Sequence, residues 1–231
     1  MFKQFYDETS STLTYLIADM VSKQAVLIDP VAENIETYLQ VISMHNLTLM
    51  YSLETHVHAD HITGGGKLKS MTMAKTGVSQ GCGAEAADIQ LQDNDIITFG
   101  NESITVIATP GHTIGSVSFK WQDRVFTGDS LLINGCGRTD FQNGDAGKLY
   151  DCITTRLFTL ADETLVYPGH DYNSKRVSSI AQEKLSNQRL ANKSRDEFIQ
   201  LMANLNLPKP KMIDIAVPAN RQCGASESQQ G

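Results

Sequence analysis

The chain has 231 residues, of which 41% are hydrophobic and 19% are charged, and its formal net charge at pH 7 is −7. This length and balance fit a globular protein with a sizeable buried core. The acidic balance argues against a nucleic-acid-binding surface, which needs clustered lysine and arginine, and no apolar run is long enough to cross a bilayer.

The first part of the chain alternates predicted strands and helices. Strands are expected at residues 12–18 and 24–28, joined by a short turn, and the second of them ends at Asp29-Pro30. A helix is expected over residues 32–44, where apolar residues recur at helical spacing. A third strand at residues 47–53 leads into a polar segment, and a short helix is expected at residues 67–70.

The second part of the chain repeats this alternation. Strands are expected at residues 96–99, 103–108, 117–121, 124–127, 165–167 and 213–217. Helices are expected at residues 146–160 and 174–204, and residues 226–231 are expected to be disordered. Two strand-rich halves separated by helices predict two sheets packed face to face with helices outside, in a single domain over residues 1–231.

The cysteines and the N-terminus suggest an intracellular setting. The four cysteines form no CxxC pair, and we expect free thiols in a reducing compartment. The N-terminus lacks the charged head and apolar stretch of a signal peptide. We therefore expect a cytoplasmic protein without a membrane or nucleic-acid partner; the oligomeric state stays open, with a homodimer as one expectation.

Histidine is scarce in this chain, yet three of the six histidines lie in the segment His56-Val57-His58-Ala59-Asp60-His61. Side chains alternate along an extended segment, so His56 and His58 point the same way. The chain then turns, and we expect Asp60 and His61 to face the same cavity. Imidazole nitrogens and carboxylate oxygens suit Zn, Fe or Mn. No cysteine lies near this segment, which argues against a closed structural zinc site.

Three further candidate ligands each follow a predicted strand and a glycine. They are His112 after Pro110-Gly111, Asp129 after Thr127-Gly128, and His170 after Pro168-Gly169. Strand ends and glycines allow backbones to converge without steric conflict. One such segment alone would more often be a turn, but their recurrence beside the histidine segment predicts a metal site.

Together these four segments resemble the metallo-β-lactamase superfamily, over residues 10–175. The resemblance implies an α+β fold, the four-layer αββα sandwich, with the site along one edge of the two sheets. It also implies up to two metal ions. The first would be held by His56, His58 and His112, the second by Asp60, His61 and His170, with Asp129 bridging them.

A narrower resemblance is to the persulfide dioxygenases, the ethylmalonic encephalopathy protein family. Its motifs lie at residues 54–64, 136–142, 170–172 and 213–220. This resemblance implies one Fe(II) per chain, held by His56, His112 and Asp129. The remaining groups, His58, Asp60, His61 and His170, would then lie around the ligands without binding the iron. The implied reaction oxidises glutathione persulfide with O₂ to sulfite and glutathione.

Glutathione carries two carboxylates, so its binding pocket needs donors. By resemblance, Tyr172 and Arg189 are the leading candidates, since a guanidinium can bind a carboxylate through two hydrogen bonds. Arg138 is a further candidate, with a structural role in its own turn as the alternative. Arg221 is the weakest of the four.

Two alternative functions remain open from the sequence. A glyoxalase II-like hydrolase of glutathione thioesters would use the same ligands with two metal ions, zinc among them, and a bridging hydroxide as nucleophile. A non-catalytic metal-binding or sulfur-carrier protein would be expected to have lost a ligand, and no ligand position is missing here.

Overall fold

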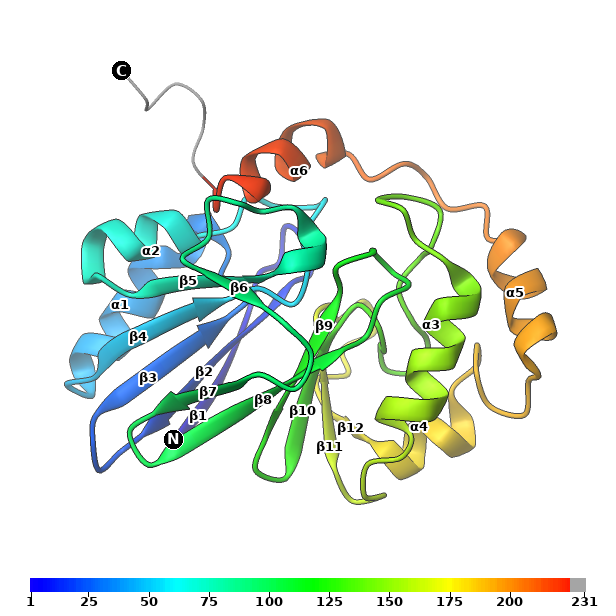
Figure 1. Cartoon of the computed structure of the whole chain (residues 1–231), viewed down its shortest axis with the longest axis horizontal. Helices are drawn as coiled ribbons and strands as arrows, with labels where there is room; N and C mark the ends of the chain where they lie inside the picture. Colours follow the sequence, from blue (N-terminus) through cyan, green and yellow to red (C-terminus); the bar gives the residue numbers. More distant parts are fainter. Residues whose placement is uncertain (225–231) are drawn as a thin grey trace.

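Two six-stranded sheets form the centre of the computed structural model, which describes residues 1–224 (Figure 1). The first sheet follows chain order: β1 (Phe2–Tyr6), β2 (Leu13–Asp19), β3 (Gln24–Ile28), β4 (Thr48–Leu53), β5 (Lys75–Ser79) and β6 (Ile89–Leu91). The second sheet runs in reverse chain order: β12 (Ser178–Ser179), β11 (Leu165–Pro168), β10 (Arg124–Gly128), β9 (Val117–Trp121), β8 (Glu102–Ala108) and β7 (Ile96–Phe99). Strands β3 to β6 pair in parallel, and so do β10 and β11.

The burial of β2 shows why the molecule is layered. All seven residues of this strand are buried. Tyr15 and Ile17 belong to the core between the sheets, whereas Leu16 and Ala18 belong to the core beneath the first pair of helices. Because side chains alternate along a strand, a strand that is apolar on both faces needs a layer on each side.

Helices cover the outer face of each sheet (Figure 1). The first sheet packs against α1 (Ile35–Met44) and α2 (Gly65–Thr72), and the second packs against α3 (Ala146–Cys152) and α4 (Ile180–Ser186), with α5 (Arg195–Ala203) packed on α3. These four layers confirm the predicted αββα sandwich. Among residues 1–224, no helix has the length and apolar character needed to cross a bilayer.

Three predicted elements differ from the structure, and one lies outside it. The strand expected at residues 213–217 is wrong, because this segment is a helix, α6 (Ile213–Arg221). The helix expected at 146–160 is α3 followed by a π-helical turn, η3 (Ile153–Leu157). The long helix expected at 174–204 is divided into β12, α4 and α5. The expectation for residues 226–231 lies outside the described residues.

Candidate metal centre

Four strand ends meet at one edge of the sandwich and carry the candidate ligands. The histidine segment follows β4, His112 follows β8, Asp129 follows β10 and His170 follows β11. Gly128 has a φ of 50°, and a Cβ there would collide with Thr55. Only glycine therefore lets the chain after β10 approach the histidine segment this closely.

The first group of ligand atoms comes from His56, His112 and Asp129. One ligand atom from each of these residues lies within 4.8 Å of the others. Nε2 of His112 lies 3.7 Å from Oδ2 of Asp129, and the rings of His56 and His112 are 4.8 Å apart between centroids. Two imidazole nitrogens and one carboxylate oxygen converging in this way form a donor set that suits iron or zinc.

The protonation states of this group favour metal binding. Burial lowers the pKa of His56 well below its ordinary value, and the neighbouring His58 and His112 act in the same direction. Burial alone would raise the pKa of Asp129, but His170, His112 and His56 outweigh it and lower the pKa. A neutral imidazole and an ionised carboxylate are the forms that a metal ion needs.

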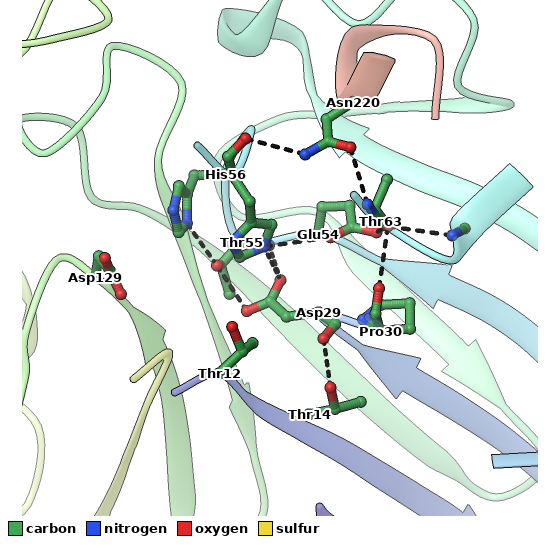
Figure 2. Close-up of polar contacts among 12 residues, drawn as sticks. Thr12, Thr14, Asp29, Pro30, Glu54, Thr55, His56, Thr63, Asp129 and Asn220 are labelled. Atoms are coloured by element: carbon green, nitrogen blue, oxygen red, sulfur yellow. Dashed lines mark hydrogen bonds and ion pairs between the residues drawn. The ribbon is translucent and has the colours of Figure 1, made fainter. Parts of the chain in front are cut away.

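Hydrogen bonds fix the tautomers of both histidines in this group. Nδ1 of His112 donates to the carbonyl oxygen of Arg138 at 2.7 Å. Nδ1 of His56 lies 3.0 Å from Oγ1 of Thr55, which itself donates to Asp29 at 2.8 Å (Figure 2). Since each Nδ1 carries a proton toward its partner, each Nε2 keeps its lone pair for a metal ion.

The second group, Asp60, His61 and His170, is joined by hydrogen bonds. Oδ2 of Asp60 lies 2.8 Å from Nδ1 of His61 and 3.0 Å from Nε2 of His170. The other ring nitrogen of His170 lies 2.6 Å from Oδ1 of Asp129. Burial would lower the pKa of His170, but Asp129 and Asp60 outweigh it and raise the pKa. His170 therefore links the two groups as a cation between two carboxylates.

His58 faces a different pair of acids. Its Nε2 lies 3.2 Å from Oδ1 of Asp29 and 3.4 Å from Oε2 of Glu54. Burial raises the pKa of Glu54 to about 7. The structure thus brings His58 close to His56, with 4.1 Å between ring centroids, but directs one of its nitrogens away from the group of His56, His112 and Asp129.

The C-terminal helix α6 contacts the histidine segment through the side chain of Asn220 (Figure 2). The amide of Asn220 accepts a hydrogen bond from the backbone nitrogen of Thr63 at 2.9 Å, and it donates to the carbonyl oxygens of His58 and His61 at 3.0 and 2.8 Å. Thr63 also donates to Glu54. Nothing in the local sequence around Asn220 predicted this contact, although residue 220 closes one of the motifs behind the resemblance.

A cavity of about 620 Å³ opens beside the two groups of ligands. Asp60, Asp129 and His170 are among the residues that line it, and so are Tyr172 and Arg189. The ring of Tyr172 stacks on His170 at 5.5 Å between centroids. The sequence did not single out Lys175, which also lines the cavity.

The remaining two candidate residues for substrate binding are placed differently. Arg138 lines the cavity, but its guanidinium is paired with Asp140 at 2.6 Å and donates to the carbonyl oxygen of Pro208 at 2.6 Å. These bonds favour a structural role for Arg138 in its own turn over a role in substrate binding. Arg221 is exposed at the end of α6 and is not among the residues that line the cavity.

Comparisons with known proteins agree with this geometry. Residues 8–170 match the model of the metallo-beta-lactamase superfamily. The mitochondrial persulfide dioxygenase ETHE1 of Homo sapiens is 46% identical, with 97% of this chain and 89% of the human protein covered. The crystal structure of ETHE1 from Myxococcus xanthus is 56% identical with a TM-score of 0.96, and it covers 97% of this chain and 100% of that one.

A relative named for a different reaction is more distant. Glyoxylase B2 of Dictyostelium discoideum is 27% identical, with 95% of this chain and 89% of that protein covered. The greater identity to the persulfide dioxygenases extends over nearly the whole chain. The chain therefore belongs to the metallo-β-lactamase superfamily and, within it, to the family of the persulfide dioxygenases.

Proposed function

We propose that this chain is an Fe(II)-dependent persulfide dioxygenase that oxidises glutathione persulfide with O₂ to sulfite and glutathione. The observation that carries the proposal is the convergence of His56, His112 and Asp129, the last of which lines a cavity of about 620 Å³. The identity of 46% to the human persulfide dioxygenase supports the reaction class. We also propose that residues 1–231 act as a single domain with one iron per chain.

The donor set fits iron chemistry. His56, His112 and Asp129 would hold Fe(II) through two imidazoles and one carboxylate, and the ion would supply the electron transfer to O₂ that side chains lack. The protein would contribute the positions and the charges of the side chains around the ion and the substrate. His170 lies between Asp60 and Asp129, so it can hold the free oxygen of the Asp129 carboxylate in place.

The cavity suits a peptide-like thiol with two carboxylates. Tyr172 is 65% exposed and stacks on His170, so its ring offers a wall beside the sulfur end of a bound substrate. Arg189 is held in place by the hydrogen bond that it donates to the carbonyl oxygen of Cys136. We assign carboxylate binding to Arg189, with Lys175 as a second cation at the cavity, and we do not assign it to Arg221.

The reaction balances with water as the third reactant. The bond between the two sulfurs breaks, the outer sulfur is oxidised to sulfite, and O₂ is reduced. Two sulfite oxygens match one O₂ and the third matches one water, and glutathione leaves as the thiol. One O₂ is therefore consumed for each sulfite formed.

The second candidate is a hydrolase of glutathione thioesters with two metal ions. The complete set of Asp60, His61 and His170 favours it, because these are the residue types that a second ion would require.

A comparison of two metal forms separates the two candidates. Protein loaded with Fe(II) under anaerobic conditions is expected to consume O₂ when glutathione persulfide is added, and protein loaded with Zn(II) is not. Both forms are then assayed for hydrolysis of a glutathione thioester. Hydrolysis by the zinc form, together with no O₂ uptake by the iron form, would reject the dioxygenase and support the hydrolase.

A further inference from the structure

The hydroxyl of Thr12 lies among the three residues that the superfamily pattern assigns to a second metal ion. Its Oγ1 is 3.1 Å from Oδ2 of Asp60, 3.3 Å from Nδ1 of His61 and 3.4 Å from Nε2 of His170. Thr12 is 0% exposed and directly precedes β2 of the first sheet (Figure 2). A protein hydroxyl thus touches one polar atom of every residue in this group.

The position of this hydroxyl is fixed from several sides. The backbone of Thr12 forms an isolated bridge with His170. Oγ1 of Thr12 also lies 2.6 Å from the hydroxyl of Ser10, which in turn lies 2.7 Å from Oδ2 of Asp7. Because the Thr12 side chain is buried and its hydroxyl has polar partners on two sides, turning it away would break a buried hydrogen bond.

Two contacts around Thr12, from His61 to Asp60 and from His170 to Asp129, are shorter than the separation expected of two ligands of one ion, whereas the 3.0 Å between Asp60 and His170 fits either arrangement. Two ligands of one zinc or iron ion, each about 2.0–2.2 Å from it, stand roughly 3 Å apart at right angles and farther apart in a tetrahedron. Nδ1 of His61 is 2.8 Å from Asp60, and Nδ1 of His170 is 2.6 Å from Asp129. Oδ2 of Asp60 is within hydrogen-bonding distance of three groups, including the Thr12 hydroxyl.

We infer that Thr12 is a positioning residue that sets the metal content of this chain at one ion. Its hydroxyl contacts Oδ2 of Asp60 and Nε2 of His170, so a second ion that took both residues as ligands would have to break these contacts. His56, His112 and Asp129 remain free to hold a single ion. The inference deepens the proposed function, since it explains how a chain with a complete second set of ligands would hold one iron.

The test counts metal ions in Thr12→Ala and Thr12→Ser. Each protein is equilibrated with Zn(II), freed of unbound metal and analysed for zinc per folded chain. Wild type and Thr12→Ser, which keeps the hydroxyl, are expected to retain one zinc, and Thr12→Ala is expected to retain two. With Mn(II), Thr12→Ala should show the electron paramagnetic resonance signal of an exchange-coupled pair, which a purely structural role would not produce.

Two results would overturn the inference. One is a single zinc in folded Thr12→Ala, and the other is two tightly bound zinc ions in wild type, which decides the matter even if the variant does not fold. Oxygen uptake by iron-loaded wild type is measured separately. Uptake together with a single zinc in Thr12→Ala rejects only the role of Thr12, whereas no uptake together with the expected zinc counts rejects only the proposed reaction.

Discussion

The two ring nitrogens of His112 face different partners, and this arrangement prepares the side chain to bind a metal ion. One nitrogen donates to the carbonyl oxygen of Arg138, and the other points toward Asp129. Both the direction and the tautomer of the ring are therefore set before a metal arrives. The sequence identified His112 from its place after a strand and a glycine, but the partner carbonyl lies 26 residues away and could not be inferred locally.

Replacing His112 by alanine should release the iron. The change removes one of three protein ligands, and the loss should exceed the roughly 10- to 100-fold drop in affinity typical of removing a supporting contact. Iron per chain measured after gel filtration checks this expectation. His45→Ala, at the C-terminal end of α1, is the matched control and should keep its iron. Equal iron content in both variants would contradict the ligand assignment.

Replacing Arg189 by alanine should weaken substrate binding without loss of iron. A hydrogen bond to a charged group contributes about 1.5–3 kcal/mol, so kcat/KM for glutathione persulfide should fall roughly 10- to 100-fold, mainly through KM. Arg195→Ala is the control, because that arginine pairs with Asp151 on the surface. A KM unchanged from wild type would place the carboxylate-binding group elsewhere in the cavity.

At the scale of elements, the prediction of a strand at α6 was wrong because the local sequence pattern resembles that of a strand. Apolar residues at 213, 215 and 217 alternate as in a strand, but the structure buries Ile213, Ala216 and Asn220 and leaves Ile215 64% exposed. Burial at intervals of three and four residues is helical. The polar Asn220 is buried because it binds the histidine segment, which a hydrophobic pattern cannot reveal.

Weakening the contacts between α6 and the histidine segment should lower the affinity of the site for metal ions. Asn220→Ala removes three hydrogen bonds to the backbone that carries His58, His61 and Thr63, and Asn220→Asp keeps the acceptor but loses both donated bonds. Both variants should bind Co(II) roughly 10- to 100-fold more weakly, by analogy with other groups that support metal ligands. The exposed Gln222→Ala is the control, and wild-type affinity in all three would show that α6 does not position the site.

For the molecule as a whole, the metal site joins parts of the chain that the sequence separates. Its ligands come from both sheets, so a bound ion ties the two halves of the sandwich together. The sequence predicted most strands, the αββα layers by resemblance and the group of His56, His112 and Asp129, but it did not single out Asp29 and Glu54, which converge with His58. It did not predict the roles of Thr12, Asp29 and Asn220, since these act through contacts between segments distant in the chain.

Metal binding should therefore stabilise the whole fold. An ion that binds only the folded state adds about 4 kcal/mol at a free concentration 1,000-fold above Kd. In a chain of this size that corresponds to an increase in Tm on the order of 10 °C. Calorimetry of the protein with and without Zn(II) checks this, and His112→Ala should lose most of the shift. An identical Tm with and without metal would mean that the ion does not bind preferentially to the folded protein.

The reaction itself offers the most direct test of the central claim, that His56, His112 and Asp129 hold one iron that serves persulfide oxidation. Oxygen consumption and sulfite formation should be recorded together on iron-loaded protein of known metal content, with glutathione persulfide as substrate. The account predicts one O₂ consumed per sulfite, at a rate proportional to an iron content that approaches one per chain. Sulfite without oxygen uptake, or a rate independent of iron content, would contradict it.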